Sequence, residues 1–141
     1  MLTALDLSKY IVSKCANDGH PISNLQLQKI LYYIQKDYLL SGSQAFSDDI
    51  EAWQFGPVVP NVYYYYSGFG AMPISLVTSN SHSFASEDMS RIDSIVIAKR
   101  DLNPWDMVSE THKSGGAWDD VYNNGQGYRG IISPELIKKK G

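Results

Sequence analysis

The chain has 141 residues, of which 43 % are apolar and 19 % are charged, and its formal net charge is −3. This length suits one domain with its own core, so we expect a single domain over residues 1–141. The acidic balance provides no overall field that attracts nucleic acid, no apolar run approaches the ~18 residues of a membrane span, and no signal-peptide pattern opens the chain, so we expect a cytoplasmic protein.

The N-terminal part predicts two helices joined by a short turn. Thr3 is a typical N-cap for the first helix, and Ser23 with Gln26 forms a capping box for a second helix that runs to about Leu40. Apolar residues recur at helical spacing in both: Leu5, Ile11, Val12 and Cys15 in the first, and Leu27, Ile30, Leu31, Ile34 and Tyr38 in the second. The two helices are therefore expected to pack as a hairpin, with the sole cysteine as a buried, reduced thiol.

A short β element is expected in the middle of the chain. Residues 50–55 read as an extended segment, and Gly56 and Pro57 then impose a turn. Residues 60–66, which begin with a proline, predict a short helix. A second extended segment at 73–78 is expected to pair with the first.

The remaining third of the chain is expected to be helical. The polar, serine-rich stretch 78–86 is interpreted as a mobile loop. Ser86, Glu87 and Asp88 open one helix, and Asn103 and Ser133 each precede another with proline at the first helical position. The expected fold is mainly α with a small β element, compact, and built on the N-terminal helical hairpin.

Aromatic residues are concentrated around the predicted turn. Trp53 and Phe55 precede it, and four consecutive tyrosines, Tyr63 to Tyr66, follow it. Successive helical residues point ~100° apart, so the four rings cannot share one face and at least one must face outward. Exposed aromatic rings are typical of protein-binding surfaces, and they fit a homo-oligomer as well as a different partner. The alternative is a turn packed on the core with one or two surface tyrosines.

His112 is the polar residue singled out by its position. It ends an amphipathic helix and shares a face with Trp105 and Val108. We expect a structural role that ties this helix to the loop around Trp118, with the charged imidazole favoured by the helix dipole. A binding role is the alternative, and catalysis a further one.

Signals for catalysis, metals or cofactors are weak. Residues 125–130 have dinucleotide-loop spacing, but no strand precedes them and no second βαβ unit fits, so a flexible loop is expected. His20, His82 and His112 lie far apart, and the chain has no Asp-x-Lys or Glu-x-Lys triplet, which many nucleases use. We expect no enzyme, no metal and no cofactor; a small metal-dependent hydrolase using His112 and Asp119 is the second alternative.

The first alternative is a DNA-binding transcriptional regulator that uses the first two helices as a helix-turn-helix. Its base and phosphate contacts would come from Gln26, Gln28, Lys29, Gln35 and Lys36. Arginine is missing from the second helix and the chain is acidic, so a structural hairpin is favoured.

Three separated segments carry a resemblance to a known family. The segments are Leu27 to Tyr33, Trp53 to Pro60, and Thr111-His112 followed by Trp118. In this order they resemble the Panacea domain of SocA-like antitoxins, first described as GepA-type phage-associated proteins, over about residues 5–137. One departure is Ala117, where the family usually has proline.

The resemblance implies an antitoxin, encoded on a prophage or mobile element, that neutralises a cognate toxin encoded nearby by direct protein contact. Nucleic acid would then be a partner only through autoregulation. The expected partner surface consists of Trp53, Phe55, Gly56, Pro57, Tyr63, Tyr64, Tyr65, Tyr66, His112 and Trp118.

Overall fold

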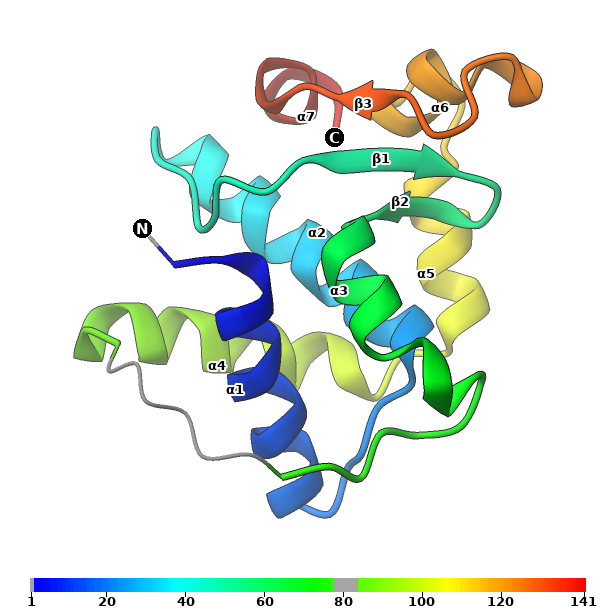
Figure 1. Cartoon of the computed structure of the whole chain (residues 1–141). Coiled ribbons are helices and arrows are strands. Elements are labelled where there is room, and N and C mark those ends of the chain that lie inside the picture. Colours follow the sequence, from blue (N-terminus) through cyan, green and yellow to red (C-terminus); the bar gives the residue numbers. More distant parts are fainter. Residues whose placement is uncertain (1, 78–83) are drawn as a thin grey trace.

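The computed structural model describes residues 2–77 and 84–141, which form a mainly helical fold with one small sheet (Figure 1). The helices are α1 (Ala4–Asn17), α2 (Asn24–Leu40), α3 (Pro60–Tyr65), α4 (Ser86–Arg100), α5 (Pro104–Thr111), α6 (Ala117–Tyr122) and α7 (Pro134–Lys140). The strands are β1 (Ile50–Trp53), β2 (Gly56–Val58) and β3 (Ile131–Ile132), and two 3-10 turns lie at Ser67–Phe69 and Asn123–Gly125. The predicted fold class is confirmed.

The N-terminal hairpin forms as its caps predict. The Thr3 hydroxyl accepts a hydrogen bond from the backbone N–H of Asp6 at 3.1 Å, and Ser23 and Gln26 form the complete capping box of α2. Cys15 is buried, as expected. α2 lies at the centre of the molecule and packs against α1, α3, α4, α5, α7 and β2. It is therefore the helix from which most of the core is built.

The sheet has the order β2-β1-β3, with both pairs antiparallel. β1 and β2 are joined by a tight turn at Gln54 and Phe55, and Trp53 pairs with Gly56. The expected pairing of residues 73–78 with the first strand is wrong, because β2 and β3 occupy both edges of β1. Residues 73–77 form no strand, and the N–H of Ile74 donates to the carbonyl of Ile22 at 2.8 Å instead.

Two C-terminal elements were not predicted, namely α6 and β3. The glycine-containing segment between them, expected to be a flexible loop, is held to the sheet: the N–H of Arg129 donates to the carbonyl of Ala52 at 2.7 Å, and the N–H of Ala52 to that of Gly130 at 2.8 Å. These bonds extend the β1–β3 pairing. The loop expected at 78–86 falls mostly on residues 78–83, which lie outside the described residues.

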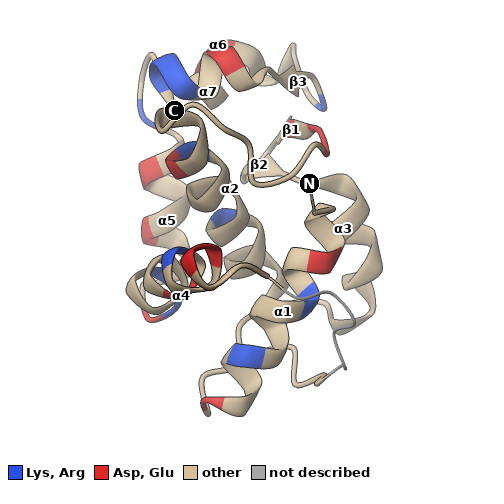
Figure 2. Ribbon diagram, turned by 90° about the vertical axis from the view of Figure 1, so that its left-hand side faces the viewer, with Lys and Arg blue, Asp and Glu red and all other residues tan. Residues whose placement is uncertain are grey.

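Charged residues are unevenly distributed over this fold (Figure 2). Acidic and basic side chains are spread over α4, α5 and α7, whereas α3 and β2 carry none. In the described part of the chain, no helix has the length and apolar character needed to cross a bilayer.

Candidate functional site

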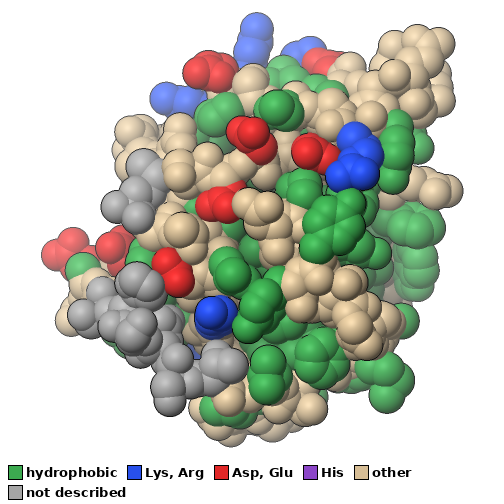
Figure 3. All heavy atoms as spheres, viewed as in Figure 1, with side chains coloured by type: hydrophobic (Ala, Val, Ile, Leu, Met, Phe, Trp, Pro, Cys, Tyr) green, Lys and Arg blue, Asp and Glu red, His purple; other side chains and the backbone are tan. Residues whose placement is uncertain are grey.

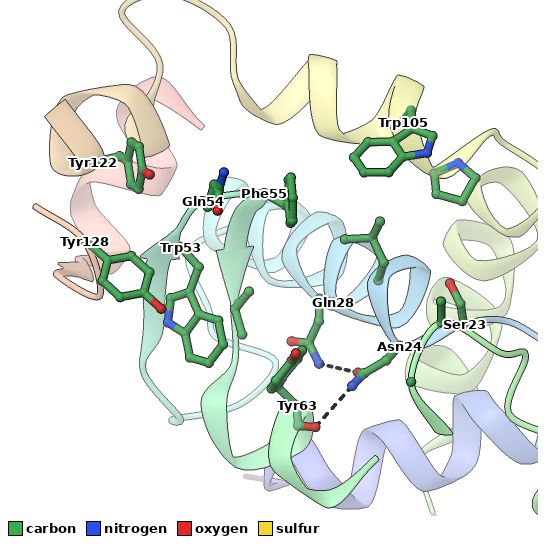
Figure 4. A pocket seen from close by; sticks show the side chains of 15 residues that line it. Ser23, Asn24, Gln28, Trp53, Gln54, Phe55, Tyr63, Trp105, Tyr122 and Tyr128 are labelled. Atoms are coloured by element: carbon green, nitrogen blue, oxygen red, sulfur yellow. Dashed lines mark hydrogen bonds between the residues drawn. The ribbon is translucent and has the colours of Figure 1, made fainter. Parts of the chain in front are cut away.

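An open groove lies beside the β1–β2 turn, with a volume of about 710 Å³. Its walls come from α2, the turn, α3, α5, α6 and the segment before β3 (Figure 4). The lining residues are Ser23, Asn24, Leu25, Gln28, Trp53, Gln54, Phe55, Val58, Tyr63, Gly70, Ala71, Pro104, Trp105, Tyr122 and Tyr128. None of these side chains is charged, and six are aromatic. We call this site the aromatic groove.

Two exposed rings face each other across one end of the aromatic groove (Figure 4). Phe55 projects from the turn and is 48 % exposed, and Trp105 projects from the first turn of α5 and is 58 % exposed. Their ring centroids are 5.5 Å apart in an edge-to-face arrangement. Asn103 caps α5 by accepting a hydrogen bond from the N–H of Trp105, which fixes the start of this helix.

Trp53 forms the centre of a second ring cluster. Its ring centroid lies 5.0 Å from that of Tyr63 and 6.3 Å from that of Tyr128. The guanidinium of Arg129 lies 4.9 Å from the Trp53 ring centroid, and the indole N–H donates to Glu51 at 2.9 Å. The half-buried Trp53 ring is thus held from several sides.

Hydrophobic side chains gather along the right-hand side of the molecule in Figure 3, where the β1–β2 turn lies in Figure 1. This distribution agrees with the uncharged lining of the aromatic groove.

Two buried amides on α2 form the floor of the aromatic groove. The Gln28 amide donates to the side chain of Asn24 at 3.0 Å, and the Asn24 amide donates to the carbonyl of Tyr63 at 3.1 Å (Figure 4). The Gln28 oxygen also accepts from the N–H of Val59 at 2.9 Å. These bonds fix α3 on α2. The sequence signal for them was a pair of amides four residues apart on an apolar helix.

The four consecutive tyrosines divide between surface and core. Tyr64 and Tyr65 are 53 % and 48 % exposed, which confirms that at least one ring faces outward. Tyr66 is 1 % exposed, and burial raises its pKa to about 12, so it is a core residue rather than part of a surface. Tyr65 packs against Tyr66 and the Lys9 ammonium, outside the aromatic groove.

Trp118 lies beneath the turn and joins three elements. It is 7 % exposed, its indole N–H donates to the carbonyl of Trp53 at 2.8 Å, and its ring stacks on His112 with centroids 3.7 Å apart. His112 is the C-cap of α5. The stacking corresponds to the structural role expected for His112, which ties α5 to the chain around Trp118.

Gly56 and Pro57 are buried and pack on a lysine that has no exposed surface. Lys29 donates from Nζ to the carbonyl of Pro57 at 3.3 Å, and burial lowers the pKa of its ammonium to about 7. Gly56 has φ +119°, and a Cβ there would lie 2.6 Å from Lys29 Nζ and 2.9 Å from Thr111 Oγ1. The turn, α2 and α5 therefore meet at one closely packed point.

The expected charge state of His112 is wrong. Burial lowers the pKa of its imidazole, and the nearby Lys29 lowers it further. These two effects outweigh the attraction of the helix dipole for a proton. The neutral imidazole is consequently the favoured form at neutral pH.

The helix-turn-helix alternative loses three of its five proposed contact residues. Gln28, Lys29 and Gln35 are buried, and the Gln35 amide donates to the carbonyl of Phe46 at 2.8 Å. Side chains that support the core in this way cannot reach DNA.

The hydrolase alternative has little geometric support. Among the described residues, no group of three His, Cys, Asp or Glu side chains could hold a metal ion, while His82 lies outside them. Asp119 accepts a hydrogen bond from the N–H of Gly115 at 3.0 Å, which gives it a role in the loop before α6.

Comparison with known proteins identifies the class. The family model described as "Antitoxin SocA-like, Panacea domain" matches residues 27–119, from α2 into α6, which includes the β1–β2 turn, Lys29 and His112. The chain therefore belongs to the SocA-like Panacea domain family, as the three sequence segments indicated.

A curated relative agrees with this assignment. The chain is 32 % identical over 129 residues to Antitoxin SocA of Caulobacter vibrioides (strain NA1000 / CB15N), and the match covers 83 % of this chain and 69 % of that protein. No solved structure matches the chain.

Proposed function

We propose that this protein is an antitoxin that neutralises a protein toxin by direct contact, without catalysis of its own. Membership of the SocA-like family and the similarity to Antitoxin SocA support an antitoxin role. The proposal includes a single domain over residues 1–141 that acts in the cytoplasm and is encoded beside its toxin on a prophage or mobile element.

The aromatic groove is the observation that best supports neutralisation by direct contact with the toxin. It has no charged lining residue, and it is flanked by Phe55, Trp105 and Tyr128, each about half exposed. Large rings with a polar edge bury much apolar area at little entropic cost, which is why they dominate binding energy at interfaces. We therefore propose that the toxin inserts apolar side chains into the groove beside these rings.

The expected partner surface is revised accordingly. Trp53, Phe55, Tyr63 and Tyr64 remain in it, and Trp105 and Tyr128 are added. Gly56, Pro57, Tyr66, His112 and Trp118 support the surface from below, because they are buried or packed behind it. Tyr65 lies beside the groove and would contact only a larger partner or a second copy of this chain.

The test is co-expression with the protein encoded by the adjacent reading frame, scored by growth and by co-purification. We expect the wild-type chain to restore growth and to form a stable complex. The double variant Phe55→Ala, Trp105→Ala removes two exposed rings and should weaken the complex at least ~30-fold, since one anchor residue contributes about 2 kcal/mol or more.

The matched control is Ile97→Ala on α4, which also removes an exposed apolar side chain, 50 % exposed, away from the aromatic groove. It should leave growth rescue and affinity unchanged. Equal binding by the double variant and the wild type would exclude the aromatic groove as the contact surface. A harmless neighbour that does not bind would instead contradict the antitoxin assignment for that gene pair.

A further inference from the structure

Burying the amine of Lys29 in the apolar core costs free energy. It has no exposed surface, and its one hydrogen bond to the described residues goes to the carbonyl of Pro57. A buried ammonium needs a counter-charge and several acceptors, whereas Lys29 has a single carbonyl. A methionine of similar shape would fill the same space without that cost.

The location of Lys29 connects this cost to the candidate surface. Its amine contacts Gly56 and Pro57, the two residues that follow the exposed Phe55. Thr111 and the His112 cap of α5, the helix that carries Trp105, also lie close to this point. A displacement of this amine therefore acts on both walls of the aromatic groove.

We propose that Lys29 is a positioning residue whose uncharged amine holds the β1–β2 turn against α2 and α5, so that protonation displaces the turn and weakens partner binding. The part that concerns binding rests on the proposed antitoxin function, whereas the movement of the turn does not.

Few charged groups face this amine from the elements packed around α2. β2 and α3 contribute none, and α5 contributes Asp106 and Glu110, both exposed, with His112 at its end. Glu110 accepts a hydrogen bond from the Tyr33 hydroxyl, one turn along α2, at 3.1 Å. Within the described part of the chain, no carboxylate thus compensates a charge on Lys29.

Several charges of the other neighbouring helices are engaged in ion pairs away from Lys29. α1, α4 and α7 form the ion pairs Lys14–Asp18, Arg91–Asp37 and Lys140–Asp120. Burial lowers the pKa of Lys36, two turns along α2, and the nearby Lys113 and Lys99 lower it further.

The direction of the pH dependence follows from the lowered pKa of Lys29. The unfolded chain keeps this lysine protonated up to its ordinary value near 10.5, whereas the folded chain releases the proton above about 7. Between these values the unfolded state binds more protons, so stability rises with pH. Below about pH 7 Lys29 is protonated in both the folded and the unfolded chain, so it no longer makes stability depend on pH.

The experiment follows the backbone amide resonance of Gly56 by NMR from pH 5.5 to 8.5. We expect the wild-type resonance to shift with a midpoint near 7, the pKa of the buried amine. Lys29→Met should abolish this transition and raise the thermal midpoint at pH 7. Lys36→Met, the matched control on the same helix, and His112→Gln should both retain it. A Gly56 resonance that does not shift, or a transition that persists in Lys29→Met, would overturn the proposal.

The second measurement tests binding with the co-purified partner at pH 6 and pH 8.5. One pH unit below its pKa, only about a tenth of the amine is neutral, so wild-type affinity should fall ~10-fold at pH 6. Lys29→Met should bind equally at both pH values. A wild-type affinity that does not change with pH would contradict the link to binding. If no partner binds at any pH, the proposed function fails while the titration of Gly56 still decides the movement of the turn.

Discussion

Gly56 is the residue on which the geometry of the turn depends most directly. Its φ of +119° lies in the region that residues with a Cβ rarely adopt. A Cβ would also approach the buried Lys29 amine and the Thr111 hydroxyl to less than 3 Å. Lys29 has no solvent space into which it can move, because it is fully buried. The glycine is thus required both by its own backbone and by its neighbours.

We therefore expect Gly56→Ala to destabilise the protein by about 2–4 kcal/mol, the sum of backbone strain and overpacking. Urea unfolding followed by circular dichroism measures the loss. Gly68→Ala is the matched control, since no atom lies within 4 Å of its added Cβ, and it should change stability by less than about 0.5 kcal/mol. Equal stability of both variants would show that the turn adapts freely.

At the scale of single residues, the sequence predicted the N-caps of helices more successfully than it predicted which side chains are buried. Thr3, Ser23, Asn103 and Ser133 each accept a hydrogen bond from the first turn of their helix, as predicted. A cap depends on residues two or three positions away, so it is visible in the local sequence. The burial of Lys29 depends instead on residues 56–57 and on α5, and no local pattern indicates it.

At the scale of elements, α6 joins the C-terminal part of the chain to the sheet. Its Trp118 donates to the Trp53 carbonyl at the end of β1, and its ring stacks between His112 and Tyr122. The sequence did not predict α6 because it is only six residues long and follows a glycine pair. Such a short helix is stabilised by tertiary contacts rather than by its own propensity.

Trp118→Phe should preserve most of the stacking and remove the indole donor. The carbonyl of Trp53 then loses a buried partner, and we expect a cost of about 1–3 kcal/mol. Hydrogen exchange should become faster in residues 53–58, where the turn loses its anchor. Trp105→Phe serves as the control, since Trp105 is 58 % exposed and its indole N–H has no acceptor among the described residues. If exchange in residues 53–58 is the same in both variants, the bond to Trp53 does not hold the turn.

At the scale of the whole molecule, the aromatic groove brings together side chains that lie far apart in the sequence. The sequence predicted that Trp53 and Phe55 belong to a binding surface, because they are large rings that directly precede a Gly-Pro turn. It did not predict Trp105 or Tyr128 as members, since their approach depends on how α5 and the segment before β3 pack. The way distant segments come together depends on the topology of the fold, which the periodic pattern of residues within one helix or strand does not reveal.

Because the lining of the aromatic groove is uncharged, the salt dependence of binding distinguishes the toxin-binding hypothesis from the DNA-binding hypothesis. With no charged residue in the aromatic groove and a net charge of −3, a complex formed there should respond little to salt. We expect the Kd for the toxin to change less than ~3-fold between 50 and 500 mM NaCl, measured by calorimetry. A complex with promoter DNA made through several phosphate contacts would weaken ~1,000-fold or more over a smaller range, because it releases condensed counterions. The double variant Phe55→Ala, Trp105→Ala should lower the toxin affinity equally at both salt concentrations, since the two rings act through apolar burial and not through charge. A steep salt dependence would place the binding energy on the charged faces of α4, α5 and α7 instead.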